Sequence, residues 1–170
     1  MRTLYRIAAA MLVAVMLTDS TLLALDSKDA AYYGGTITVF GNPKDAVEGK
    51  LDTSDEKTLL FAAYGKEFAG KTFSITYAKI SDLEYGQKAG RRVGAAAATT
   101  VLLGPLGLIT LFSKKRKHYL TIGFKDDADK DQVAVLELGK DMVRTTLAII
   151  QTRSGKQVEY QDEEAKKSGK

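Results

Sequence analysis

The chain of 170 residues contains no cysteine and a single histidine, His118. Without cysteine it forms no disulfide bond, carries no thiol nucleophile and builds no cysteine-ligated zinc site. A lone histidine without a cysteine or a second histidine beside it cannot head a metal site either. We therefore expect no metal and no cofactor, and we expect His118 to be an ordinary residue at the start of a strand.

A large excess of charge of one sign is missing as well. The 25 basic and 21 acidic side chains leave a net charge of +4. A nucleic-acid-binding protein typically shows a strong basic stripe with aromatic side chains between the basic ones. The basic residues of this chain instead gather around one short segment, so we expect no nucleic-acid partner.

The acidic residues do not predict catalysis. They are scattered over predicted turns and strand faces, and no pair is placed for general acid and general base roles. Asp127-x-Asp129-x-Asp131 resembles the start of a calcium loop, but Gln132 stands where such a loop has glycine and Leu138 where it has glutamate. The motif predicts a solvated turn, and we expect the chain not to be an enzyme.

Residues 1–25 have the layout of a secretory signal peptide. Arg2 and Arg6 give a positive start, residues 7–17 form a short apolar core, and a polar break follows at residues 18–20. The core is shorter than the roughly 20 residues that span a bilayer as a helix. We expect an exported protein of the periplasm or cell envelope, with an uncleaved N-terminal anchor or a buried helix as the alternatives.

A long uncharged stretch lies in the middle of the chain, between segments that alternate like strands. The 20 residues from Val93 to Phe112 carry no charge, two arginines precede them, and a basic run at 114–117 follows. The stretch is long enough to cross a bilayer once, but a single crossing would separate strands that we expect to pair. We therefore predict an apolar hairpin over residues 88–113, with its turn at 104–107.

This hairpin is the predicted docking element. Its apolar side chains would enter an apolar environment, while the basic residues at its base would meet anionic head groups at about 1 kcal/mol each. The predicted membrane- or partner-contacting residues are Arg91, Arg92, Val101, Leu102, Leu103, Leu106, Leu108, Ile109, Leu111, Phe112, Lys114, Lys115, Arg116 and Lys117. Because an exposed apolar segment of this size marks an interface, the expected partner is an anionic membrane surface or another protein. The alternative is that the hairpin folds over the barrel or pairs with another copy of the chain.

Small residues recur every four positions at the start of the hairpin, at Gly86, Gly90, Gly94 and Ala98. On a helix they would share one face, where a second helix can approach closely. This spacing is typical of a glycine zipper. It favours a self-associating scaffold, and hence a homo-oligomer, as the rival interpretation.

Strands with alternating apolar residues are predicted on both sides of the hairpin. They cover residues 32–40, 44–52, 58–64, 73–77, 80–85, 119–124 and 133–138. A helix over 141–154 follows, with Asp141 as its N-cap and Gly155 just past its end, and residues 156–160 add a last extended segment. Either Glu84 or Glu137 is expected to pair with Arg144 or Lys79. The charged tail, residues 161–170, is predicted to be disordered.

The predicted domain, residues 32–160, is mainly β with one C-terminal α-helix, an antiparallel barrel or sheet interrupted by the apolar, Gly-rich hairpin. The spacing Gly49-x-Leu51, Leu59-x-Phe61 and Ile75-x-Tyr77-x-x-Ile80-x-x-Leu83-Glu84-Tyr85 resembles the core of bacterial PH-like and GRAM-like domains. The resemblance extends over about residues 35–155 and implies a barrel closed by the C-terminal helix. The chain departs from the family pattern at the hairpin, where a short loop would normally lie. The hairpin predicts a non-catalytic docking module.

Overall fold

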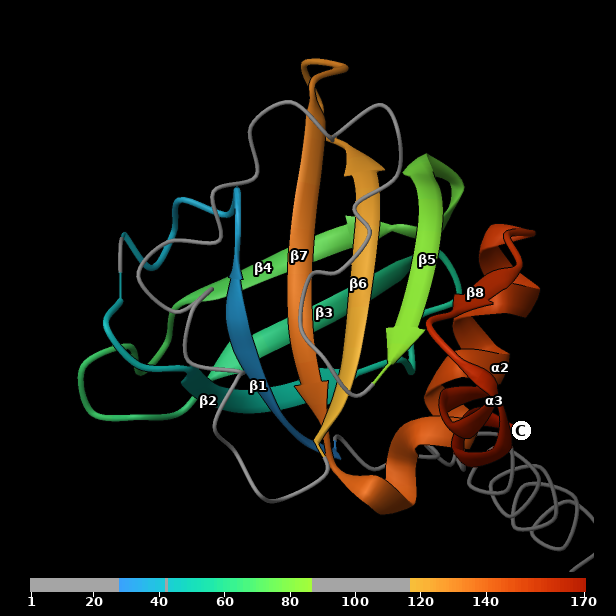
Figure 1. Cartoon of the computed structure of the whole chain (residues 1–170). Coiled ribbons are helices and arrows are strands. Elements are labelled where there is room, and N and C mark those ends of the chain that lie inside the picture. Colours follow the sequence, from blue (N-terminus) through green and yellow to red (C-terminus); the bar gives the residue numbers. More distant parts are fainter. Residues whose placement is uncertain (1–27, 42, 87–116) are drawn as a thin grey trace, which may run out of the picture.

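The computed structural model in Figure 1 describes residues 28–41, 43–86 and 117–170. The predicted signal segment and nearly all of the predicted hairpin lie outside these residues. The strands are β1 (Lys28–Gly35), β2 (Val47–Asp52), β3 (Thr58–Ala63), β4 (Thr72–Thr76), β5 (Ile80–Gly86), β6 (His118–Lys125), β7 (Asp131–Leu138) and β8 (Val158–Tyr160). The helices are the 3-10 turns η1 (Tyr77–Lys79) and η3 (Lys140–Met142) and the α-helices α2 (Val143–Ser154) and α3 (Glu163–Gly169).

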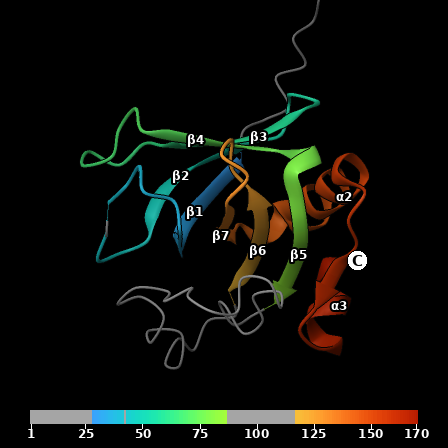
Figure 2. The same ribbon diagram turned by 90° about the horizontal axis from the view of Figure 1, so that it is seen from above.

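The strands form one sheet in the order β4-β3-β2-β1-β7-β6-β5-β8. Neighbours are antiparallel except β5 and β8, which are parallel. Figure 1 shows β2, β3 and β4 running across β5, β6 and β7, and Figure 2 shows α2 and α3 beside the β5 end of the sheet. The mainly β fold with a C-terminal helix is therefore confirmed. The sheet differs from the expected antiparallel barrel or sheet in that it is mixed, and its end strands are β4 and β8.

The apolar positions that carry the resemblance form the core of this sheet. Side chains alternate between the two faces of a strand, and the inward positions are filled by large apolar residues. Leu51, Leu59, Phe61, Ile75, Tyr77, Ile80, Leu83 and Tyr85 are each at most 2% exposed. Gly49 is required beside them, because a Cβ at that position would collide with the Phe61 ring and would lie 2.6 Å from the carbonyl oxygen of Ala62.

Helix α2 closes the core through Val143, Leu147 and Ile150, each at most 1% exposed. Gly155 ends the helix as predicted, with a φ of 69° and with its N–H donating to the carbonyl of Gln151 at 2.9 Å. Glycine adopts this left-handed conformation without the steric cost that a Cβ would bring.

The prediction that Asp141 is the N-cap of this helix is wrong. Asp141 lies inside η3, and α2 begins at Val143 without a side-chain cap. The 3-10 turn replaces the cap, since the N–H of Met142 donates to the carbonyl of Gly139 at 3.1 Å.

The first strand lies earlier in the chain than predicted. β1 ends at Gly35, and the alternating Ile37 and Val39 lie beyond it, outside any strand. A strand that is paired on both edges, here by β2 and β7, is held by backbone hydrogen bonds and needs few apolar side chains. Ala30 and Tyr32 are the buried apolar residues that β1 contributes.

The C-terminal tail is folded, contrary to the prediction of disorder. Asp162 caps α3, because its Oδ1 accepts a hydrogen bond from the N–H of Ala165 at 2.7 Å. Ala165 and Gly169 are the buried residues of this helix. A Cβ on Gly169 would lie 2.6 Å from the Tyr160 ring and 3.2 Å from the Leu147 side chain. Small residues thus let α3 approach closely, and they produce no hydrophobic pattern in the sequence.

The substitution Ala165→Asp tests how α3 is held. A buried charge without a partner is unfavourable, so A165D should release α3 and lower the free energy of unfolding by about 1–3 kcal/mol. Urea denaturation measures this change, and amide hydrogen exchange of residues 161–170 reports the release. The control, K167D, changes an exposed position of the same helix and should cost less than about 0.5 kcal/mol. Equal effects of the two substitutions would contradict docking through Ala165.

Candidate docking site at the base of the insertion

The segment that contains the predicted hairpin, residues 87–116, is called the insertion below. Among the predicted contact and packing residues, Gly86 and Lys117 belong to the described part of the chain and flank the insertion. The others lie outside the described residues: Arg91, Arg92, Val101, Leu102, Leu103, Leu106, Leu108, Ile109, Leu111, Phe112, Lys114, Lys115, Arg116, Gly90, Gly94 and Ala98. The geometry of the site is therefore that of its base.

The two strands that flank the insertion are paired neighbours. β5 and β6 run antiparallel, and their register ends with Tyr85 opposite Leu120 and Gly86 opposite Tyr119. The insertion therefore leaves the sheet and re-enters it at adjacent points of one end. A single bilayer crossing by residues 93–112 is incompatible with this pairing, because it would place β5 and β6 on opposite sides of the membrane. None of the helices in the described part of the chain is long and apolar enough to cross a membrane.

Gly86 does not belong to a helix, so the proposed glycine zipper does not begin there. It is the last residue of β5, and a Cβ on it would collide with the side chain of Gln161. The small residue at this position accommodates the segment between β8 and α3. The prediction that Gly86 lies on a helix-packing face is wrong.

Lys117 is tied to the domain rather than projecting from it. Its Nζ donates to Oε2 of Glu137 at 2.8 Å and lies 5.6 Å from the centre of the Tyr33 ring. The lysine and glutamate side chains are 33% and 25% exposed, so the pair is partly shielded from solvent. The Tyr33 ring meets the Tyr119 ring edge to face at 5.1 Å. Lys117 therefore fixes the re-entry point of the insertion, and its charge is already engaged.

The exit point of the insertion is fixed by a chain of polar side chains. The hydroxyl of Tyr85 lies 2.6 Å from Nδ1 of His118 and 3.2 Å from Oγ of Ser168. The Tyr85 and His118 rings are stacked, with planes 5° apart. One tyrosine thus joins β5, the first residue of β6 and helix α3. The prediction that His118 begins a strand is confirmed.

The surroundings of His118 favour its neutral form. Burial lowers its pKa below the usual 6.5, and the positive charge of Lys140 lowers it further, while Glu137 acts in the opposite direction. When Nδ1 carries no proton, the Tyr85 hydroxyl donates to it. Burial also raises the pKa of Tyr85, so the tyrosine stays protonated at neutral pH.

The ion pairs expected from the sequence are different in the structure. Glu137 pairs with Lys117, and Lys79 pairs with Asp127 at 2.7 Å. Glu84 is 5% exposed, and its Oε1 accepts a hydrogen bond from Nε2 of Gln161 at 2.7 Å. The partner of each of these side chains depends on how the strands are arranged in the sheet. The sequence pattern does not reveal that arrangement.

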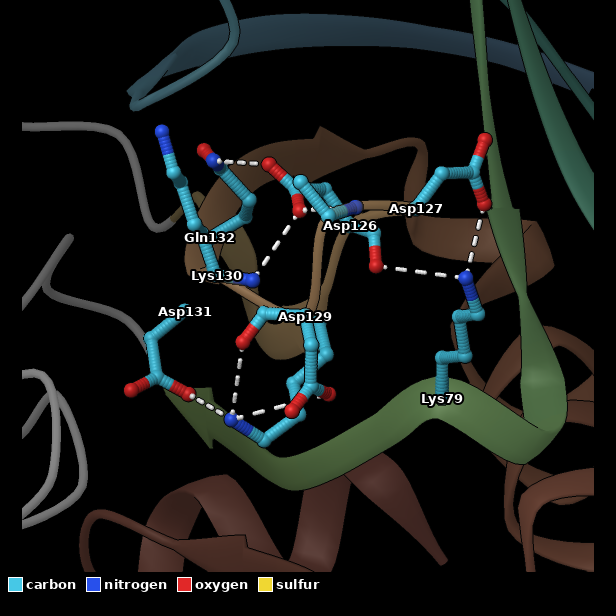
Figure 3. A network of polar contacts seen from close by, with 9 residues as sticks. Lys79, Asp126, Asp127, Asp129, Lys130, Asp131 and Gln132 are labelled. Atoms are coloured by element: carbon cyan, nitrogen blue, oxygen red, sulfur yellow. Dashed lines mark hydrogen bonds and ion pairs between the residues drawn. The ribbon is translucent and has the colours of Figure 1, made fainter.

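The aspartate-rich turn between β6 and β7 lies at the opposite end of these strands from the insertion. Figure 3 shows its carboxylates facing lysines and backbone N–H groups. Asp126 accepts hydrogen bonds from the N–H groups of Lys130 and Ala128 and from Nε2 of Gln132, at 2.8–3.0 Å, and these bonds keep its pKa below the usual range. Nζ of Lys125 lies 3.1 Å from the Asp131 carboxylate. The part of the chain that the structure describes holds no group of acidic, histidine or cysteine residues able to bind a metal ion.

One hollow on the described surface does not favour an anion. It has a volume of about 580 Å³ and lies between residues 43–48 and 65–68. Its charged lining residues are Lys44, Asp45, Glu48, Lys66 and Glu67. Three carboxylates outweigh two ammonium groups there, so the sign of the charge is wrong for phosphate or sulfate.

Comparison with known proteins yields a structural relative. No protein-family model and no curated protein matches the chain. The hSac2 domain from human phosphoinositide phosphatase Sac2 is similar in structure, with a TM-score of 0.54 at 10% sequence identity, over 92% of this chain and 89% of that one. The fold is PH-like. At this identity the similarity establishes the fold and carries no residue of that domain over to this chain.

Sequence reasoning did not find most of the residues at the base of the insertion. Tyr33, Glu137 and Ser168 are brought together with Lys117 and Tyr85 by pairing between distant strands and by the docking of α3. The sequence signal available for this site was the run of basic residues that ends at Lys117. It indicated the end of the sheet at which the insertion is attached.

The single histidine gives a direct test of this environment. Because the pKa of His118 is lower in the folded chain than in the unfolded chain, its neutral form stabilises the fold above pH 6.5. This contribution is lost as the pH falls through the folded pKa. NMR titration of the wild-type chain should give a pKa below 6.5, and Lys140→Gln should raise it. The free energy of unfolding should fall between pH 7.5 and 5.5, and less so in His118→Gln. A His118 pKa at or above 6.5 would contradict the geometry described.

Proposed function

We propose that the chain is a non-catalytic, envelope-associated binding module that docks to anionic membranes through residues 88–113. Its PH-like fold is compatible with lipid or protein binding. The observation that carries the proposal is the pairing of β5 with β6, which presents an uncharged 20-residue stretch from one end of a folded domain. The N-terminal signal-like segment supports export to the periplasm or cell envelope.

The energetics support stable association. Arg91, Arg92, Lys114, Lys115 and Arg116 flank the apolar stretch, and each basic residue near an anionic surface contributes about 1 kcal/mol or less. Lys117 is left out of this sum, because it is paired with Glu137. Partial burial of the leucine, isoleucine and phenylalanine side chains adds about 25 cal/mol for each Å² removed from water. The apolar term supplies adhesion, and the basic rim supplies preference for anionic lipid.

A self-associating scaffold that uses the same residues is the second candidate. It is favoured by the size of the apolar stretch, since an apolar segment of this length marks an interface of some kind. Such a scaffold forms oligomers without lipid and shows no preference for anionic head groups.

Neutralising the basic rim tests the membrane proposal. The triple variant K114Q/K115Q/R116Q should reduce partition onto anionic vesicles by up to about 100-fold. Flotation of the chain with vesicles containing phosphatidylglycerol measures this. The matched control, K50Q/K57Q/K130Q, removes three exposed charges outside the insertion and should leave partition nearly unchanged. Equal losses in the two variants would mean that net charge, rather than the insertion, determines binding.

The shortened chain separates the two candidates. In it, residues 93–112 are replaced by a short Gly-Ser turn, which the adjacent ends of β5 and β6 can accommodate. The shortened chain should stay folded and should no longer float with vesicles. If neither chain floats and the intact chain alone forms oligomers, the insertion is a protein interface and the membrane proposal is wrong.

A further inference from the structure

A hollow lies between helices α2 and α3, on the flank of the sheet that β8 closes. Its volume is about 540 Å³. One wall comes from α2, and the facing wall comes from β8, from the residue before β8 and from the C-terminal end of α3. Figure 2 shows both helices at this flank. Sites for small ligands have volumes in this range, with a few polar groups that fix the ligand.

The charged side chains that line the hollow are all basic. They are Arg144 of α2, Lys166 of α3 and Lys170. Lys170, the last residue of the sequence, is left out of the charge count. Among the described residues, no acidic side chain lines this hollow, whereas carboxylates outnumber ammonium groups in the hollow between residues 43–48 and 65–68. The sign of the charge therefore suits an anion.

Neither of the two counted cations has a strong partner. Arg144 is exposed, and it makes no ion pair or hydrogen bond within the part of the chain that the structure describes. Nζ of Lys166 lies 3.6 Å from Oε1 of Glu163, and these side chains are 45% and 83% exposed. Because an exposed pair of this kind contributes little to stability, Lys166 can turn to a ligand at small cost.

Gln151 of α2 adds a neutral donor whose orientation is fixed. Its Oε1 accepts a hydrogen bond from the N–H of Val158 at 3.0 Å. Since a backbone N–H can bond to the amide oxygen but not to the amide nitrogen, this contact determines which way the side-chain amide points. Nε2 carries two N–H donors, and no acceptor for them is found among the described residues. An anion in the hollow would supply one.

The spacing of the residues on α2 leaves room for that anion. Arg144, Ala148 and Gln151 lie on one face of the helix, because positions four and seven residues apart are neighbours there. Ala148 stands between the two polar side chains, and its methyl group leaves the space above it open. The facing wall is held close by Gly169, since a Cβ on it would lie 2.6 Å from the Tyr160 ring.

We propose that the hollow between α2 and α3 binds a phosphate group. Arg144 and Lys166 neutralise its charge, and Gln151 donates a hydrogen bond to one of its oxygens. A guanidinium group can bind two phosphate oxygens at once, whereas an ammonium group acts as a point charge. The phosphate group belongs to a lipid headgroup or to a free phosphate compound.

The hollow lies close to the exit point of the insertion. A Cβ on Gly169 would lie 3.2 Å from the Tyr85 ring, and Oγ of Ser168 lies 3.2 Å from the Tyr85 hydroxyl. Tyr85 is followed by Gly86, the last residue of β5. Docking through the insertion would therefore bring this flank near lipid head groups. The use of the hollow on a membrane rests on the proposed function, but the binding of phosphate does not.

Titration of the full chain with inorganic phosphate, at constant pH and ionic strength, tests the proposal. The NMR signal of the Gln151 side-chain amide should shift and reach saturation. R144Q should weaken the affinity at least about tenfold, because it removes a charge-assisted contact.

A matched pair of variants places the same charge inside and outside the hollow. A148E puts a carboxylate between Arg144 and Gln151 and should abolish the saturable shift. T145E adds a carboxylate at an exposed position of α2 that does not line the hollow, so it should bind phosphate nearly as well as the wild-type chain. Both positions are exposed, and circular dichroism checks that both variants are folded. A shift that never saturates, or equal affinities of A148E and T145E, would overturn the proposal.

Flotation with phosphatidylglycerol vesicles then identifies the source of the phosphate group. If A148E floats less than T145E and inorganic phosphate competes, the ligand is a lipid headgroup. If the two variants float equally while A148E alone has lost phosphate binding, the ligand is a free phosphate compound. If the wild-type chain does not float, the proposed membrane function fails, and the phosphate titration still decides whether the hollow is a binding site.

Discussion

The pairing of β5 with β6 is the constraint on which the rest of the structure depends. Six registered residue pairs, from Ile80 with Phe124 to Gly86 with Tyr119, bring together the two ends of a long excursion of the chain. The entropic cost of closing a loop rises only slowly with its length, so a sheet can tolerate such an insertion. Once the strands are paired, whatever the insertion binds is attached to the domain at two neighbouring points.

A second consequence is that the base of the insertion is coupled to the C-terminus. The Tyr85 hydroxyl contacts both His118, where β6 begins, and Ser168 of α3. β8 pairs in parallel with β5 just before α3 begins. The final residues of the chain therefore support the strand from which the insertion departs, and their loss would loosen the end of that strand as well as the core.

Most of the fold could be read from the sequence, because inward positions of strands and of α2 carry large apolar residues at regular spacing. The pattern failed where burial depends on small residues or on backbone pairing. β1 is central yet contributes Ala30 and Tyr32 to the core, and α3 docks through Ala165 and Gly169. For the candidate site, the run of basic residues beside the insertion was the only signal that the sequence offered. Its partners, such as Glu137 for Lys117, are set by strand register, which one sequence does not reveal.

The central claim, that the insertion enters a bilayer while the domain stays outside, is tested most directly by depth-dependent fluorescence quenching. A fluorophore on L106C would be read with anionic vesicles that contain lipids spin-labelled along their acyl chains, beside the same fluorophore on L60C of β3. The account predicts strong quenching at position 106, dependent on anionic lipid, and little quenching at position 60. Absence of quenching at position 106 with the protein bound to vesicles would contradict it, because the apolar stretch would then lie outside the hydrocarbon.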